Sequence, residues 1–176
     1  HVETVAFFDG VGNARQTVTR DNENDLAIVQ ESLMDYEGRP AVALMPTPVL
    51  PAAMSASNLD LRSPLKFYDN YSLAHSDNTP FNKQHFDLDV NRNDPTGLAT
   101  NGPERAGSYY STANPLRDYG FYRYLPSAVG SNGAYTYSRT LYDLHGRVKA
   151  QAGRGPEYRI GGGHTTEYFY GTPSQE

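Results

Sequence analysis

A turn motif that occurs three times in this chain limits the folds that the chain can adopt. In each copy two apolar residues precede an Asp, two variable positions follow, and Gly and then Asn or Arg complete the motif. The copies span residues 7–13, 33–39 and 141–147. An Asp side chain at the first position of a turn accepts a hydrogen bond from a backbone N–H two residues on, and Gly at the fourth position supplies the positive φ that closes a hairpin loop. The motif therefore predicts three β-hairpins.

The motif also assigns a role to each of its polar residues. The predicted turns begin at Asp9, Asp35 and Asp143. The glycines that we expect at positive φ are Gly12, Gly38 and Gly146. A guanidinium forms strong, forked hydrogen bonds with a carboxylate. We therefore expect four arginines to pair with Asp35, with Asp143 or with backbone carbonyls and to lock successive hairpins: Arg39, Arg139, Arg147 and Arg159.

The rest of the chain has the pattern of a β protein. The sequence contains 16 Gly and 12 Pro among 176 residues, which is too many breakers for long helices. Between them lie short segments rich in Val, Thr, Tyr and Phe, which are typical of strands. These segments are 4–8, 14–19, 41–45, 135–142, 147–152 and 165–170. Two windows, 26–34 and 50–54, have apolar residues at helical spacing but fit strands as well.

The spacing of the motif predicts the organisation of the chain. Asp9 and Asp35 are 26 positions apart, which suits stacked two-strand units, but Asp143 lies 108 positions further on. We therefore expect an all-β segment of stacked β-hairpins that form a strip of sheet, with a long irregular insertion. Two hairpins occupy 1–46, the insertion rich in Tyr, Pro and Asn occupies 47–133, and a hairpin with a terminal strand occupies 134–176.

The insertion needs a means of attachment, because a structureless loop of this length is unusual inside a compact domain. Its aromatic side chains are the groups best suited to pack against the sheet. We expect contacts from Phe67, Tyr68, Tyr71, Phe81, Phe86, Tyr109, Tyr110, Phe121, Tyr122 and Tyr124.

Composition excludes several classes of protein. No run approaches 18 consecutive apolar residues, so insertion into a membrane as a helix is not expected. The net charge of -5 argues against a nucleic-acid partner. With no Cys, the chain has no disulfides, thiol catalysis or Cys-based zinc sites. The first residues include neither Met nor a signal segment, which favours a piece of a longer protein.

The third copy, Tyr142-Asp143-x-x-Gly146-Arg147, resembles the Tyr-Asp repeat of RHS (rearrangement hot spot) proteins. Residues 7–18 and 153–173 resemble a segment that lies upstream of the repeats in very large bacterial RHS proteins. The middle of the chain matches only loosely. This sequence departs from the repeat where Asn13 replaces Arg and where Phe8 and Met34 replace Tyr, so the geometry of those copies is less well predicted.

The resemblance implies a fold and a function. In this family the hairpins stack into a strip of sheet that spirals into a hollow shell, which often encloses a toxin until it is delivered. The chain would then be a structural scaffold, secreted or at the bacterial cell surface. Its partners would be the remainder of its own RHS chain and a toxin or effector as cargo. Each hairpin covers the edge of its neighbour, so open edges are expected at both ends of this segment.

The sequence also contains groups that resemble catalytic or metal sites. Asp87, Asp89, Asn91 and Asp94 place oxygen atoms at alternate positions, as in a loop that wraps Ca²⁺, but a calcium loop of the EF-hand type needs Gly where Asp94 stands and an acid where Thr100 stands. We therefore interpret these residues as a solvated loop. The segment 94–98 resembles an RHS self-cleavage site but is explained by turn chemistry. We predict no catalytic residue, no metal and no cofactor.

An alternative function is a carbohydrate-binding or adhesive β module at the cell surface, for which a surface glycan would be the partner. The Tyr-rich stretch 108–137 could stack against sugar rings, because Tyr combines a flat ring with a polar tip. The same side chains suit the lining of a partly wet sheet face. The scaffold is the prediction that we favour, since no motif places a nucleophile, a base or paired carboxylates together.

Overall fold

The computed structural model describes residues 2–21, 26–49, 64–69, 71, 109–110, 136–155 and 157–171. The regular elements of this part of the chain are all β-strands. They are β1 (Glu3–Phe8), β2 (Ala14–Asp21), β3 (Leu26–Met34), β4 (Pro40–Leu44), β5 (Thr47–Pro48), β6 (Tyr137–Tyr142), β7 (Val148–Ala152) and β8 (Thr166–Glu167). The all-β prediction is confirmed, and the window 26–34 is a strand.

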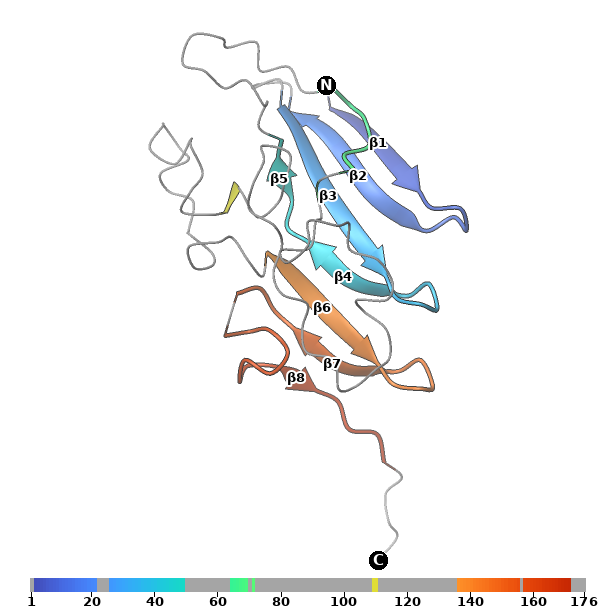
Figure 1. Ribbon diagram of the computed structural model, residues 1–176, viewed down its shortest axis with the longest axis vertical. Helices are drawn as coiled ribbons and strands as arrows, with labels where there is room; N and C mark the ends of the chain where they lie inside the picture. The colour runs from blue at the N-terminus through green and yellow to red at the C-terminus, as the bar shows by residue number, and fades with distance from the viewer. Residues whose placement is uncertain are drawn as a thin grey trace, which may run out of the picture.

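The strands form one open antiparallel sheet in the order β1-β2-β3-β4-β6-β7-β8, and β5 pairs with β3. Three hairpins make up most of it: β1 with β2, β3 with β4, and β6 with β7. Their turns lie along the same edge of the strip, as Figure 1 shows. The strip of stacked hairpins is the predicted architecture, although β8 is shorter than the predicted strand 165–170.

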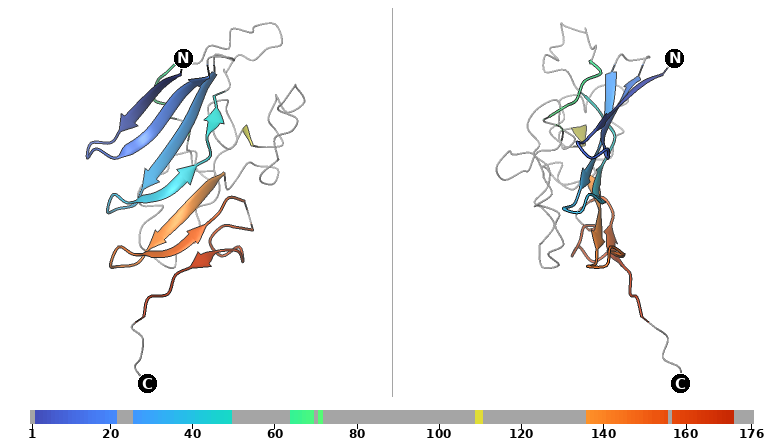
Figure 2. Two further views of the ribbon diagram at one scale, coloured as in Figure 1. Left: turned by 180° about the vertical axis from the view of Figure 1, so that it is seen from behind. Right: turned by 90° about the vertical axis from the view of Figure 1, so that its right-hand side faces the viewer.

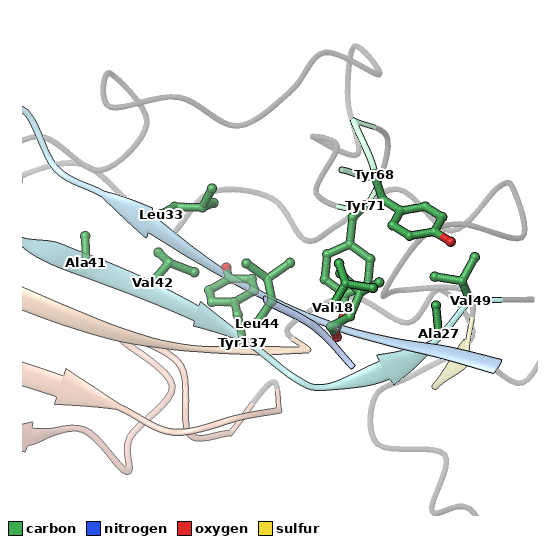
Figure 3. Packing of buried hydrophobic residues seen from close by; sticks show 11 residues of the cluster. Val18, Ala27, Leu33, Ala41, Val42, Leu44, Val49, Tyr68, Tyr71 and Tyr137 are labelled. Atoms are coloured by element: carbon green, nitrogen blue, oxygen red, sulfur yellow. Dashed lines mark hydrogen bonds between the residues drawn. The ribbon is translucent and has the colours of Figure 1, made fainter. Parts of the chain in front are cut away.

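One face of the sheet carries the core. Alternate residues of β3, namely Ala27, Val29, Glu31 and Leu33, are buried, and they pair with neighbours on β2 and β4 in register. Two side chains from the segment 64–71, Tyr68 and Tyr71, complete the cluster. Figure 3 shows side chains of this cluster packed together, and the edge-on view in Figure 2 shows residues 64–69, 71 and 109–110 on the same side of the sheet.

Gln16 attaches the segment 64–69 to the sheet through its side-chain amide. Its Nε2 donates to the backbone carbonyl of Tyr68 at 3.2 Å, and its Oε1 accepts from the backbone N–H of Tyr68 at 2.8 Å. The amide thus acts as a neighbouring strand would, by satisfying both backbone groups of one residue. Because Gln16 is only 1% exposed, these two bonds prevent unpaired polar groups in the core.

The strand after the second turn is interrupted between β4 and β5, and two tyrosines bridge the interruption. The Tyr71 hydroxyl lies 2.7 Å from the carbonyl oxygen of Val29 and 2.6 Å from that of Met45 and donates to this pair. The Tyr110 hydroxyl donates to the carbonyl of Pro46 at 2.7 Å. These contacts and the packing of Phe67 on Phe7 confirm that aromatics of the insertion attach it to the sheet. The expected contacts of Phe81, Phe86, Phe121, Tyr122 and Tyr124 lie outside the described residues.

Replacing Tyr71 by Phe should destabilise the protein by about 1 to 3 kcal/mol, because the carbonyl of Val29 loses the Tyr71 hydroxyl and the carbonyl of Met45 keeps only the Thr47 hydroxyl of the two. The matched control is Tyr68→Phe, which removes a hydroxyl that donates to the carbonyl of Pro64 and should cost about 0.5 to 1 kcal/mol. Urea unfolding followed by circular dichroism measures both changes. Equal losses in the two variants would contradict a special role for Tyr71.

The same side chain predicts a dependence on alkaline pH. Burial raises the pKa of Tyr71 above its usual 10.0. The unfolded chain therefore ionises this hydroxyl before the folded chain does, so its contribution to stability is complete below pH 10.0 and falls as the pH rises further. Tyr71→Phe should show a flatter decline of unfolding midpoint with alkaline pH than the wild-type chain.

Candidate functional site

The three turns share one backbone geometry. In each, the N–H of the Asp donates to the carbonyl of the residue four positions on, at 2.9, 2.9 and 2.8 Å. The N–H of the closing Gly donates back to the Asp carbonyl at 3.1, 3.1 and 3.0 Å. The φ angles of Gly12, Gly38 and Gly146 are 89°, 79° and 79°. The predicted turns and their positive-φ glycines are confirmed.

The Asp carboxylates bind the inside of each turn in the same way. One carboxylate oxygen accepts the N–H groups of the residues two and four positions on, at 2.8 to 3.0 Å in all three turns. The other oxygen accepts a side-chain donor: Asn13 Nδ2 at 3.2 Å, Arg39 Nε at 2.8 Å or Arg147 Nε at 2.7 Å. Each turn is therefore closed by its own Asp and by the side chain four residues on.

These hydrogen bonds favour the ionised carboxylates. The N–H of Asn13 lowers the pKa of Asp9 below its usual 3.8, and the N–H of Val11 adds to the effect. At Asp143, partial burial acts to raise the pKa, but hydrogen bonds from Arg147 and from the N–H of His145 outweigh it and lower the pKa below 3.8. Both turns are therefore held most firmly while their Asp is charged.

A β-bulge precedes each turn Asp and changes the pairing of the two strands of the hairpin at the residue before the Asp. The register shifts between Phe7 and Phe8, between Leu33 and Met34, and between Leu141 and Tyr142. The residue before each Asp then lies opposite the residue six positions further along the chain. These pairs are Phe8 with Ala14, Met34 with Pro40, and Tyr142 with Val148. A Pro is tolerated at such a position because the bulge needs no N–H from it.

Successive turns are joined by an arginine and a tyrosine. The Arg39 guanidinium of the second turn lies over the Tyr142 ring of the third, with its Cζ atom 4.6 Å from the ring centroid. The Tyr142 hydroxyl returns to the second hairpin and donates to the carbonyl of Pro40 at 3.0 Å. A Cβ atom on Gly146 would lie 3.5 Å from Arg39 Nη1, so the two turns are in close contact. We call this combination of stacked ring and hydroxyl bond a rung.

A second rung lies beyond the third turn. The Arg147 guanidinium lies over the Tyr170 ring at 4.4 Å, and the Tyr170 hydroxyl donates to the carbonyl of Val148 at 2.9 Å. Tyr170 follows β8, and Gly171 stands where a further Asp would be. Sequence reasoning did not find this contact, although Phe169-Tyr170 repeats the pattern of Leu141-Tyr142, an apolar residue followed by Tyr, and was an available signal.

The expected roles of the arginines need correction. Arg39 and Arg147 pair with Asp35 and Asp143 as predicted, but each pair closes its own turn. The face of the Arg39 guanidinium contacts Tyr142 of the next hairpin, while Nη2 faces Asp35 and Nη1 pairs with Glu37 at 3.0 Å. Arg139 lies away from the turns, on the covered face of β6, where it is 1% exposed.

Asp87, Asp89, Asn91 and Asp94, and the segment 94–98, lie outside the described residues. Within the part of the chain that the structure describes, no group of three His, Asp or Glu residues could hold a metal ion. The stretch 161–163 forms a turn, in which Gly162 donates to the carbonyl of Arg159 at 2.8 Å. None of the described residues belongs to a helix with the length and apolar character to cross a membrane.

Comparisons with models of known protein families, with curated proteins and with solved structures find no match to this chain. The resemblance to RHS proteins therefore stays a prediction that depends on the motif itself. The geometry that the structure adds to that motif is a column of similar turns with a rung between the second and third turns and another after the third.

Replacing Gly146 by Val should destabilise the protein by about 1 to 3 kcal/mol, because a β-branched residue resists the positive φ of this position. Gly10→Val in the first turn is the matched control. Gly10 has open space around it and does not have a left-handed φ, so its replacement should change stability by about 0.5 kcal/mol or less. Thermal or urea unfolding measures the difference, and similar effects in both variants would contradict the turn argument.

Asp143→Asn should weaken the dependence of stability on acid. The folded pKa of Asp143 is lowered, so its contribution is present above the unfolded value of 3.8 and is lost as the pH falls through the folded value. Between about pH 5 and about pH 3 the unfolding midpoint of the variant should therefore fall less than that of the wild-type chain. Leu144→Ala, at an exposed variable position of the same turn that does not titrate, should keep the wild-type dependence.

Proposed function

We propose that the chain is a structural scaffold segment of a large bacterial RHS-type protein. Its hairpins would form part of the wall of a β-sheet shell that encloses a toxin or effector. The partners would be the rest of the same protein chain and the cargo, at the cell surface or after secretion. The proposal assigns no catalytic residue, metal or cofactor to the chain.

The observation that carries the proposal is the repetition of one contact along the sheet. The rungs Arg39–Tyr142 and Arg147–Tyr170 have ring distances of 4.6 and 4.4 Å and hydroxyl bonds of 3.0 and 2.9 Å. A contact that is reproduced so closely lets hairpins be added one after another without a new interface each time. Repeat proteins extend by the same means.

The two outer strands also support a segment of a longer strip. In the part of the chain that the structure describes, β1 pairs with β2 alone and β8 pairs with β7 alone. An edge strand presents backbone groups that can pair with a further strand, and a protein that functions alone usually protects such an edge. β1 is six residues long, and its Thr4 and Ala6 are exposed.

The test is the state of association of the chain and its dependence on the β1 edge. We expect residues 1–176 to associate in a concentration-dependent way in light scattering. Val5→Lys places a charge on the face of β1 that faces the core and should reduce the association, as inward-pointing charges do at natural edge strands. Thr17→Lys adds the same charge to the other face of the sheet on β2, which has strands on both sides, and is the control for the added charge.

Three results would contradict the proposal. One is a monomeric chain with a sharp, cooperative melt, which would indicate an independent module. Another is association that Val5→Lys and Thr17→Lys change equally. The third is specific binding on a glycan array, which would favour the carbohydrate-binding alternative.

A further inference from the structure

We infer that the residue four positions after each turn Asp selects the residue that precedes the Asp of the next hairpin. On this basis Asn13 and Met34, which depart from the repeat in two different hairpins, are one matched pair. The inference rests on the proposed function, because it states how the scaffold determines which hairpin docks on which.

The selecting side chain has two tasks when it is Arg. Arg39 donates from Nε to the Oδ2 atom of Asp35 at 2.8 Å, and its Nη2 lies 2.7 Å from the same oxygen as an ion pair, which closes its own turn. The flat face of the guanidinium is not used by these in-plane bonds, and it lies over the Tyr142 ring. A cation over an aromatic face is attractive, and Tyr adds a hydroxyl that reaches the carbonyl of Pro40. Arg therefore favours Tyr in the next hairpin.

The first turn has neither part of this rung. Asn13 donates its single side-chain nitrogen, Nδ2, to Asp9 at 3.2 Å, and this atom lies 3.5 Å from the Cβ position on Gly38 of the next turn. It therefore occupies the same place as Arg39 beside Gly146, but it is shorter and uncharged. Met34 stands where the next hairpin would have Tyr, and it has neither a ring nor a hydroxyl. The position without Arg and the position without Tyr thus face each other between the first and second hairpins, whereas Arg faces Tyr in both rungs further along the sheet.

The rung at Tyr170 shows that the choice does not depend on the turn that follows the tyrosine. Gly171 replaces the Asp there, yet Arg147 and Tyr170 make the same two contacts as Arg39 and Tyr142. The preference therefore comes from the preceding arginine and the carbonyl beside it. The arginine of the preceding turn therefore determines which residue is favoured before the Asp position of the next hairpin.

Two double-mutant cycles test the inference in the chain of 176 residues. The first combines Asn13→Arg with Met34→Tyr, and the second combines Arg39→Asn with Tyr142→Met. In the first, the unfolding constant of the double variant should be about threefold to tenfold lower than the product of the single effects predicts. In the second, the increase in the unfolding constant of the double variant should be about threefold to tenfold smaller than the product of the two single increases. Urea unfolding and hydrogen exchange at the Gly38 and Gly146 amides give the global and local values.

The matched control pairs Asn13→Arg with Tyr142→Met, which lie at different junctions, and their effects should multiply within about twofold. The inference would be overturned if the effects at the facing pairs 13/34 and 39/142 also multiplied within about twofold. Hydrogen exchange keeps the test decisive for a variant with a broad unfolding curve, because it reports each turn separately. Independent cycles with intact association through β1 would overturn this inference alone, whereas coupled cycles in a monomeric chain would overturn only the proposed function.

Discussion

The arrangement depends on an Asp carboxylate that accepts two backbone N–H groups inside its own turn. These bonds at Asp9, Asp35 and Asp143 fix the position at which the chain reverses, and the bulge before each Asp fixes the register of the strands that follow. Because all three hairpins reverse in the same way, their turns lie along one edge of the sheet (Figure 2). Contacts between turns become repeatable only when that local geometry is repeated.

A single open sheet has a second requirement, which is a cover for its apolar face. The hairpins cannot supply this cover themselves, because they all lie in the single layer of the sheet. The segment 64–71 does so with Tyr68 and Tyr71, and the amide of Gln16 takes the place of a strand for the backbone of Tyr68. An amide is suited to this because it offers a donor and an acceptor at the spacing of a peptide group.

The sequence predicted the features that depend on near neighbours, and of the distant contacts it predicted only that aromatics of the insertion attach it to the sheet, not which groups they bind. The turn at Asp35 needs only Gly38 and Arg39, so five residues were enough to predict it. The window 26–34 was ambiguous between helix and strand, because its apolar spacing fits both, and pairing with β2 and β4 decides it. The bridge from Tyr71 to Val29 and Met45 joins residues 42 and 26 positions apart, and no local pattern indicates it. The direction of the Arg39 face was missed for the same reason.

The rung explains why one side chain can serve both the turn and the sheet. A guanidinium forms its strongest bonds in its plane and its cation–π contact perpendicular to that plane. Arg39 can therefore hold Asp35 and stack on Tyr142 without either contact weakening the other, and Arg147 does the same with Asp143 and Tyr170. Lysine has one compact charge and would have to divide it between the two partners. The planar cation thus couples closure of one hairpin to docking of the next. In a strip built in this way, the arginine that one turn holds in place positions the tyrosine of the following hairpin.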